Sequence, residues 1–218
     1  MKRLFILLSL HMAILSGPMA ADWEWWNEGV IEILAEEKTA LHIMSEQKLI
    51  DHPGRIYCQN YGAAVTYDLS NFWAIDAGYL FERERELHNS SWSSWLNEQR
   101  VIGSISSRWK WANASLSNRL RFEYRDLEAR DNRWRCRDRV KAKHCLGPHL
   151  FNASWFISND LFYSLTEDGF VKNRMLMGLG KDLGRGFEIE IYYMIESKRD
   201  GEWKHDINVL GSGVSWHP

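Results

Sequence analysis

The stretch RWRCRDRVKAK, residues 133–143, places a basic side chain at every second position. It does so six times in succession, although the formal net charge of the 218-residue chain is only -2. Successive side chains of a β-strand point to opposite faces, so this period of two collects all six cations on one face of one strand. The balancing acids are expected on the polar faces of other strands.

The same alternation of apolar and polar residues recurs along the chain. It is clear in FWAIDAGYLFERER at 72–85, LSNRLRFEYRDLE at 116–128 and GFEIEIYYMIESK at 186–198. About eleven such segments are separated by turn-like links such as DLSN, TEDG and KRDGE. No segment after the first twenty residues sustains a period of 3.6, so the pattern predicts an all-β protein.

Residues 1–21 are expected to be a signal peptide. Two basic residues precede an apolar run over 4–15, which gives way to small residues ending at Ala20 and Ala21. This order is typical of a secretory signal, and the run is too short for a spanning helix. Residues 22–218 then form one exported domain, in which no apolar run approaches the ~18 residues that a membrane helix needs.

Twelve tryptophans favour a membrane barrel over a soluble sandwich. Most lie at or near expected strand ends, including Trp23, Trp25 and Trp26, where indoles form girdles at the level of lipid headgroups. Only helices and closed barrels satisfy all backbone groups in lipid. We therefore predict a closed antiparallel up-and-down transmembrane barrel of 10–12 strands with a charged lumen, in the outer membrane of a Gram-negative bacterium. Ten or twelve strands are expected because single-chain bacterial barrels have even strand numbers.

The charged faces are expected to point into the lumen. An Arg or Lys facing lipid near the bilayer midplane costs ~2–4 kcal/mol, so a ladder of six cannot face outward there. Asp138 has the opposite parity and shares the outer face with Trp134 and Val140. The predicted lumen network comprises Glu98, Arg100, Arg119, Arg121, Glu123, Arg125, Arg133, Arg135, Arg137, Arg174, Glu188 and Glu190.

The chain also resembles a known family. The segments NEQR, LSNRLRFEYR, RWRCRDR, KNRMLMGLG, FEIEIYYM and the closing HDINVLGSGVSW are similar in order and spacing to the bacterial domain-of-unknown-function 2490 family. The resemblance covers nearly the whole exported chain and implies a small outer-membrane β-barrel without an established activity. Matched positions are Glu98, Arg100, Arg119, Arg121, Glu123, Arg125, Arg133, Arg135, Arg174 and Glu190.

Three functions remain open. Paired Arg and Glu side chains that fill the lumen favour a structural protein, or one that acts through its loops. Unpaired cations would instead favour a narrow anion-selective pore. A lipid hydrolase is the third hypothesis, since His88, Asn89, Ser90 and Ser91 lie in an expected outer loop, but adjacent loop residues seldom have the geometry of a catalytic site. No catalytic residue is assigned.

No cofactor or metal is expected, because Cys136, His144, Cys145 and His149 match no common zinc spacing. The expected partners are outer-membrane lipid and the barrel-assembly machinery, which recognises an amphipathic last strand such as residues 205–216. Nucleic acid is not a plausible partner for an exported chain.

Overall fold

The computed structural model of the chain describes residues 23–50, 55–88, 91–128, 131–147, 153–166, 169–200 and 202–218. The predicted signal peptide, residues 1–21, lies outside these ranges. Within them there is no helix of the length and hydropathy needed to cross a membrane. All regular structure in this part of the chain is β, as the alternating pattern predicts.

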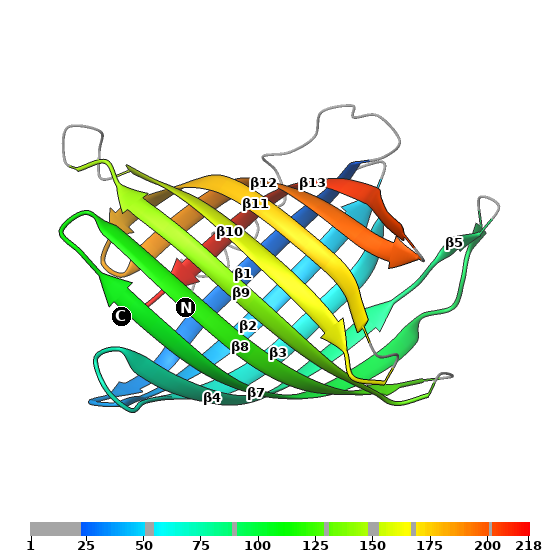
Figure 1. Cartoon of the computed structure of the whole chain (residues 1–218), viewed down its shortest axis with the longest axis horizontal. Coiled ribbons are helices and arrows are strands. Elements are labelled where there is room, and N and C mark those ends of the chain that lie inside the picture. The colour runs from blue at the N-terminus through cyan, green and yellow to red at the C-terminus, as the bar shows by residue number, and fades with distance from the viewer. Residues whose placement is uncertain are drawn as a thin grey trace, which may run out of the picture.

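Eleven of the described strands form one closed barrel (Figure 1). Neighbours in sequence are neighbours in the barrel and run antiparallel, which confirms the predicted up-and-down topology. The short strands β5 (Leu87–His88) and β6 (Ser91–Trp92) form a separate hairpin, which extends beyond one end of the barrel in Figure 1. The barrel strands are β1 (Trp23–Glu36), β2 (Thr39–Ile50), β3 (Ile56–Asp68), β4 (Trp73–Glu84), β7 (Leu96–Lys110), β8 (Ala114–Leu127), β9 (Arg133–Cys145), β10 (Ala153–Ser164), β11 (Gly169–Gly184), β12 (Phe187–Asp200) and β13 (Glu202–Trp216).

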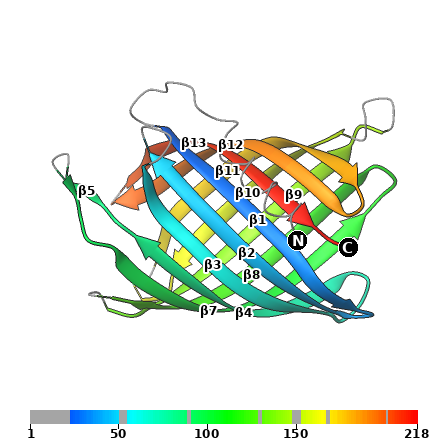
Figure 2. The same ribbon diagram turned by 180° about the vertical axis from the view of Figure 1, so that it is seen from behind.

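The barrel closes through a parallel pair, β1 and β13 (Figure 2). Their register runs from Trp23 beside Asn208 to Ile31 beside Trp216. In an up-and-down barrel an odd strand number brings the first and last strands together in the same direction. Eleven strands fall within the predicted range of 10–12 and agree with the count of alternating segments, but the expectation of an even number, ten or twelve, is wrong.

The two faces of the sheet have opposite polarity. Every barrel strand from β1 to β12 carries at least one exposed large apolar side chain, such as Val101 at 59% and Ile191 at 60% exposure. The alternate positions hold the charges, including Glu123 at 1% and Glu196 at 2% exposure. A soluble protein buries apolar groups and exposes charge, so this barrel is inverted with respect to one.

Asp138 lies on the outer face, as its parity predicts, and it has a polar neighbour there. The Asn118 side-chain amide of β8 donates a hydrogen bond of 2.5 Å to the Asp138 carboxylate of β9. Trp134 and Val140, on the same face, are exposed. The adjacent strand thus supplies a hydrogen-bond donor for this carboxylate.

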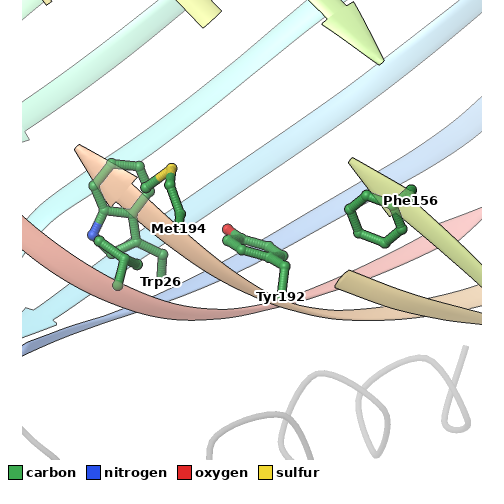
Figure 3. Close-up of a cluster of buried hydrophobic side chains, with 5 residues drawn as sticks. Trp26, Phe156, Tyr192 and Met194 are labelled. Atoms are coloured by element: carbon green, nitrogen blue, oxygen red, sulfur yellow. The ribbon is translucent and has the colours of Figure 1, made fainter. Parts of the chain in front are cut away.

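Aromatic rings and glycines alternate in one inward-facing row across five adjacent strands. The row runs Phe156, Gly178, Tyr192, Gly211 and Trp26, each residue opposite the next in the strand register. A methyl group on Gly178 would lie 2.6 Å from the Phe156 ring, and one on Gly211 would lie 2.1 Å from the Tyr192 ring. Glycine therefore lets each ring lie flat over the neighbouring strand. Figure 3 shows Phe156, Tyr192 and Trp26 along this wall.

The position predicted for Trp26 is wrong. Trp26 is expected to belong to a girdle of indoles at a lipid interface, but its side chain is only 3% exposed and lies in a buried cluster with Phe156, Tyr192, Met194 and Val209. Its indole N–H donates to Glu24 at 2.8 Å. Part of the barrel interior is therefore apolar, and the lumen is charged on one wall and aromatic on another.

Candidate functional site: the charged lumen

Three carboxylates organise the arginines of β7, β8 and β9. Glu98 accepts hydrogen bonds from Arg100 and from Arg125, the latter at 2.5 and 2.7 Å. Arg100 also pairs with Glu82 of β4. This layer thus joins three strands by charge-assisted hydrogen bonds, which are stronger than neutral ones.

The second and third layers are centred on Glu123 and Asp160. Glu123 accepts hydrogen bonds from both ends of the Arg135 guanidinium, one of them at 2.8 Å. Asp160 of β10 accepts a pair of hydrogen bonds from Arg139, at 2.6 and 2.8 Å, and another from Arg137. The Arg side chains of the alternating ladder on β9 therefore reach acids on both neighbouring strands.

The last two cations of the ladder pair with a strand that is not adjacent to β9. Lys141 donates to Glu190 of β12 at 2.9 Å, and Lys143 donates to Glu188. Small residues on the intervening strands leave room for these pairs, since a methyl group on Gly180 would lie 3.1 Å from a Glu188 oxygen. Both ion pairs therefore link side chains across two intervening strands.

A further cluster surrounds Glu196 and Phe162. Glu196 pairs with Arg174 at 2.6 Å and with Lys172 at 2.8 Å. The guanidinium of Arg174 lies 5.0 Å from the centre of the Phe162 ring, as do those of Arg135 and Arg137. Phe162 is 1% exposed, so three guanidinium groups share one buried ring and gain cation–π attraction there.

The predicted network residues are thus brought into contact to different degrees. Glu98, Arg100, Arg125, Glu123, Arg135, Arg137, Arg174, Glu188 and Glu190 all make close ion pairs. Arg133 opposes Arg125 in the register of β8 and β9. Arg121 lies 3.9 Å from Glu123, and Arg119 has no carboxylate within ion-pair distance among the described residues.

A cavity of about 420 Å³ lies inside the barrel. Four of its lining arginines lie on β8 and β9, namely Arg119, Arg121, Arg137 and Arg139, and two more are Arg100 and Arg174. The lining also contains acids of β1, β2, β4 and β8, and apolar side chains such as Met194 and Leu176.

A separate group of possible metal ligands lies on β1, β2 and the C-terminal residues. One ligand atom from each of Glu32, His42 and His217 lies within 4.8 Å of the others. Carboxylate and imidazole suit transition metals, and the sequence prediction does not name these residues. Cys136 and Cys145 are free thiols, and His149 lies outside the described ranges.

The sequence prediction also misses Asp160 and Glu82. Aromatic residues occur on both faces of the β10 segment ASWFISNDLFYS, because Phe156 and Phe162 point inward while Trp155 points outward. These two inward rings weaken the polarity contrast that would otherwise assign Asp160 to the lumen. The pairing of β10 with β9 would have identified Asp160 as a lumen residue, because Asp160 stands opposite Arg139, whose direction is clear from the sequence.

Together the fold and the lumen define a closed β-barrel with an apolar outer face and an ionic and aromatic interior. The chain belongs to the family described as Protein of unknown function (DUF2490), whose model matches residues 11–205. The family predicted from the sequence motifs is therefore confirmed. No curated protein matches the sequence.

Solved structures of two outer-membrane proteins resemble the chain weakly. An anion-selective porin from Comamonas acidovorans is 10% identical, with a TM-score of 0.39 over 82% of this chain and 55% of the porin. The outer-membrane expressed OmpT of Vibrio cholerae is 7% identical, with a TM-score of 0.42 over 80% of this chain and 61% of that protein. The chain thus spans less than two thirds of the length of these structures.

Proposed function

We propose that the protein is an outer-membrane β-barrel with an occluded lumen, which acts as a scaffold for its loops. The observation that carries this proposal is the inverted polarity: exposed apolar side chains on the strands outside, and ion pairs inside. Lipid is the solvent that makes an apolar outer face favourable.

Occlusion rests on the packing of the interior. Trp26, Phe156 and Phe162 are at most 3% exposed although they point into the barrel. Lys141 and Lys143 form ion pairs with β12, beyond two intervening strands, so their side chains occupy space within the lumen. The cavity found among the described residues has a volume of about 420 Å³, the size of a small-molecule site.

A substitution at an outward-facing position tests whether the barrel lies in a membrane. Val101, near the middle of β7, is 59% exposed. Val101→Arg costs ~2–4 kcal/mol if this surface contacts the bilayer midplane, but stays within about ±0.5 kcal/mol if it contacts water. The free energy of unfolding is measured by urea titration of protein refolded in lipid vesicles. Ala112→Arg, at an exposed position in the β7–β8 turn, is the matched control and should have little effect. Equal small effects would argue against a membrane-facing strand.

A narrow anion-favouring pore is the second candidate, because six arginines line the cavity. Planar-bilayer recordings of the refolded protein distinguish the two candidates. Absence of channel events supports the occluded barrel, and steady conductance with anion selectivity supports the pore. The hydrolase hypothesis receives no support from geometry, since Asn89 and Ser90 lie outside the described ranges and the side chains of His88 and Ser91 are not described.

A further inference from the structure

Three pairs of arginines stand directly opposite each other on β8 and β9, and two of these pairs line the cavity. Arg119 of β8 opposes Arg139 of β9, and Arg121 opposes Arg137. Directly opposed residues in antiparallel strands have Cβ atoms ~4.5–5.5 Å apart, and like charges at this spacing repel. The arrangement needs compensating negative charge close to all four guanidinium groups.

The protein supplies only part of that charge. Asp160 is shared by Arg137 and Arg139, and its two oxygens accept three hydrogen bonds from them. The only carboxylate within ion-pair distance of Arg121, among the described residues, is Glu123 at 3.9 Å, which already binds Arg135. Within the described part of the chain, the buried Nε atoms of Arg121 and Arg137 have no hydrogen-bond partner, and Arg119 makes no ion pair.

Three other acids of the cavity lining make contacts elsewhere. Asp76 accepts hydrogen bonds from Thr66 at 2.6 Å and Ser104 at 2.7 Å. Glu28 accepts one from the Tyr192 hydroxyl at 2.7 Å. Glu46, also in the lining, accepts from Asn60 at 2.6 Å and lies 3.3 Å from Lys48. Each of these carboxylates thus makes its hydrogen bonds to residues other than the four arginines, and none of the three forms an ion pair with them among the described residues.

We propose that the lumen cavity binds a small oxyanion, a phosphate group, held by Arg119 and Arg121 and flanked by Arg137 and Arg139. Guanidinium groups match the geometry of phosphate oxygens and bind them in pairs. The cavity volume of about 420 Å³ falls within the range of small-molecule sites, ~300–1,000 Å³. The phosphate group supplies the missing negative charge and provides acceptors for the unpartnered Nε–H groups.

The experiment measures how the unfolding midpoint of the full, refolded barrel depends on inorganic phosphate. Chloride at equal ionic strength is the reference. A ligand that binds only the folded state raises stability with its concentration. Wild-type protein should be stabilised by phosphate, and Arg119→Gln should weaken the apparent affinity at least about tenfold, because it removes a charge-assisted contact.

The direction in which Arg119→Gln changes the stability in phosphate-free buffer distinguishes a ligand site from a structural role. Arg119→Gln relieves repulsion from Arg139, so the variant should be as stable as the wild type or more stable without phosphate, and less stable with it. Arg125→Gln is the matched control on the same strand and face; its side chain pairs with Glu98 and does not line the cavity. The control should keep the phosphate dependence.

The phosphate group has two possible sources, a free ion or a lipid headgroup. Stabilisation by inorganic phosphate identifies the free ion, and stabilisation only by a short-chain phosphatidic acid identifies the headgroup. If neither ligand shifts the midpoint, or if Arg119→Gln responds as the wild type does, the proposed site is refuted. Because conductance is measured separately, failure here leaves the occluded-barrel proposal untouched.

Discussion

Gly211→Ala tests whether the aromatic–glycine row determines the stability of the barrel. Gly211 lies on β13, beside the parallel seam, and faces Tyr192 of β12. The added methyl carbon would lie 2.1 Å from the Tyr192 ring, while carbon atoms in contact prefer ~3.5–4.0 Å. The ring must therefore retreat by about 1.5 Å.

The ring has little freedom to move. Tyr192 is 7% exposed, and its hydroxyl donates to Glu28 of β1 at 2.7 Å. Overpacking costs ~1–3 kcal/mol, and a hydrogen bond to a charged group contributes ~1.5–3 kcal/mol. A displaced ring incurs the first cost and weakens the second interaction, so we expect a loss of ~3 kcal/mol in the free energy of unfolding.

The assay is urea unfolding of the refolded barrel, followed by tryptophan fluorescence and by the mobility of unheated protein on gels. Gly103→Ala on the outer face of β7 is the control, because an added methyl there has no heavy atom within 4 Å. In a double-mutant cycle, Gly211→Ala should cost little once Tyr192 is replaced by Ala. The reasoning is refuted if Gly211→Ala and Gly103→Ala have equal effects, or if the two substitutions at Gly211 and Tyr192 are additive.

The remaining predictions concern the ion pairs. Glu123→Gln removes the charge that Arg135 needs in a site where Glu123 is 1% exposed, so the free energy of unfolding should fall by ~3–5 kcal/mol. Arg108→Gln breaks the exposed pair with Asp68 at 2.6 Å, and the same urea titration should detect at most ~1 kcal/mol, because solvent screens that pair. Equal losses for the two variants would show that burial does not set the strength of these pairs.

The alternating pattern predicts the fold well where the two faces of a strand differ strongly in polarity. On β9 an outward-facing Arg ladder is too unfavourable in lipid, so the direction of Arg135 and Arg137 follows from parity alone. On β10 the contrast is weak, because aromatic residues occupy both faces, and Asp160 is missed. Trp26 is misplaced for the same reason: an indole suits both a lipid interface and an interior that is partly aromatic.

The pairing of the charges depends on geometry that parity does not contain. Parity assigns Lys141 and Glu190 to the lumen, but their contact across two strands follows from the curvature of the closed sheet and from small residues such as Gly180. The strand number is likewise decided by closure. The expectation of an even strand number fails here because β1 and β13 pair as parallel strands. Closure by an antiparallel pair would need an even number of strands.

This seam also restricts how the chain can be rearranged. Because β1 and β13 point the same way, Trp23 and Trp216 lie at opposite ends of a seam of nine paired positions. At ~3.3 Å per residue, a linker joining them would have to travel roughly 26 Å along the wall. A circular permutant therefore cannot be made with a tight turn, and tags fused beyond these two residues would emerge at opposite ends of the sheet cylinder.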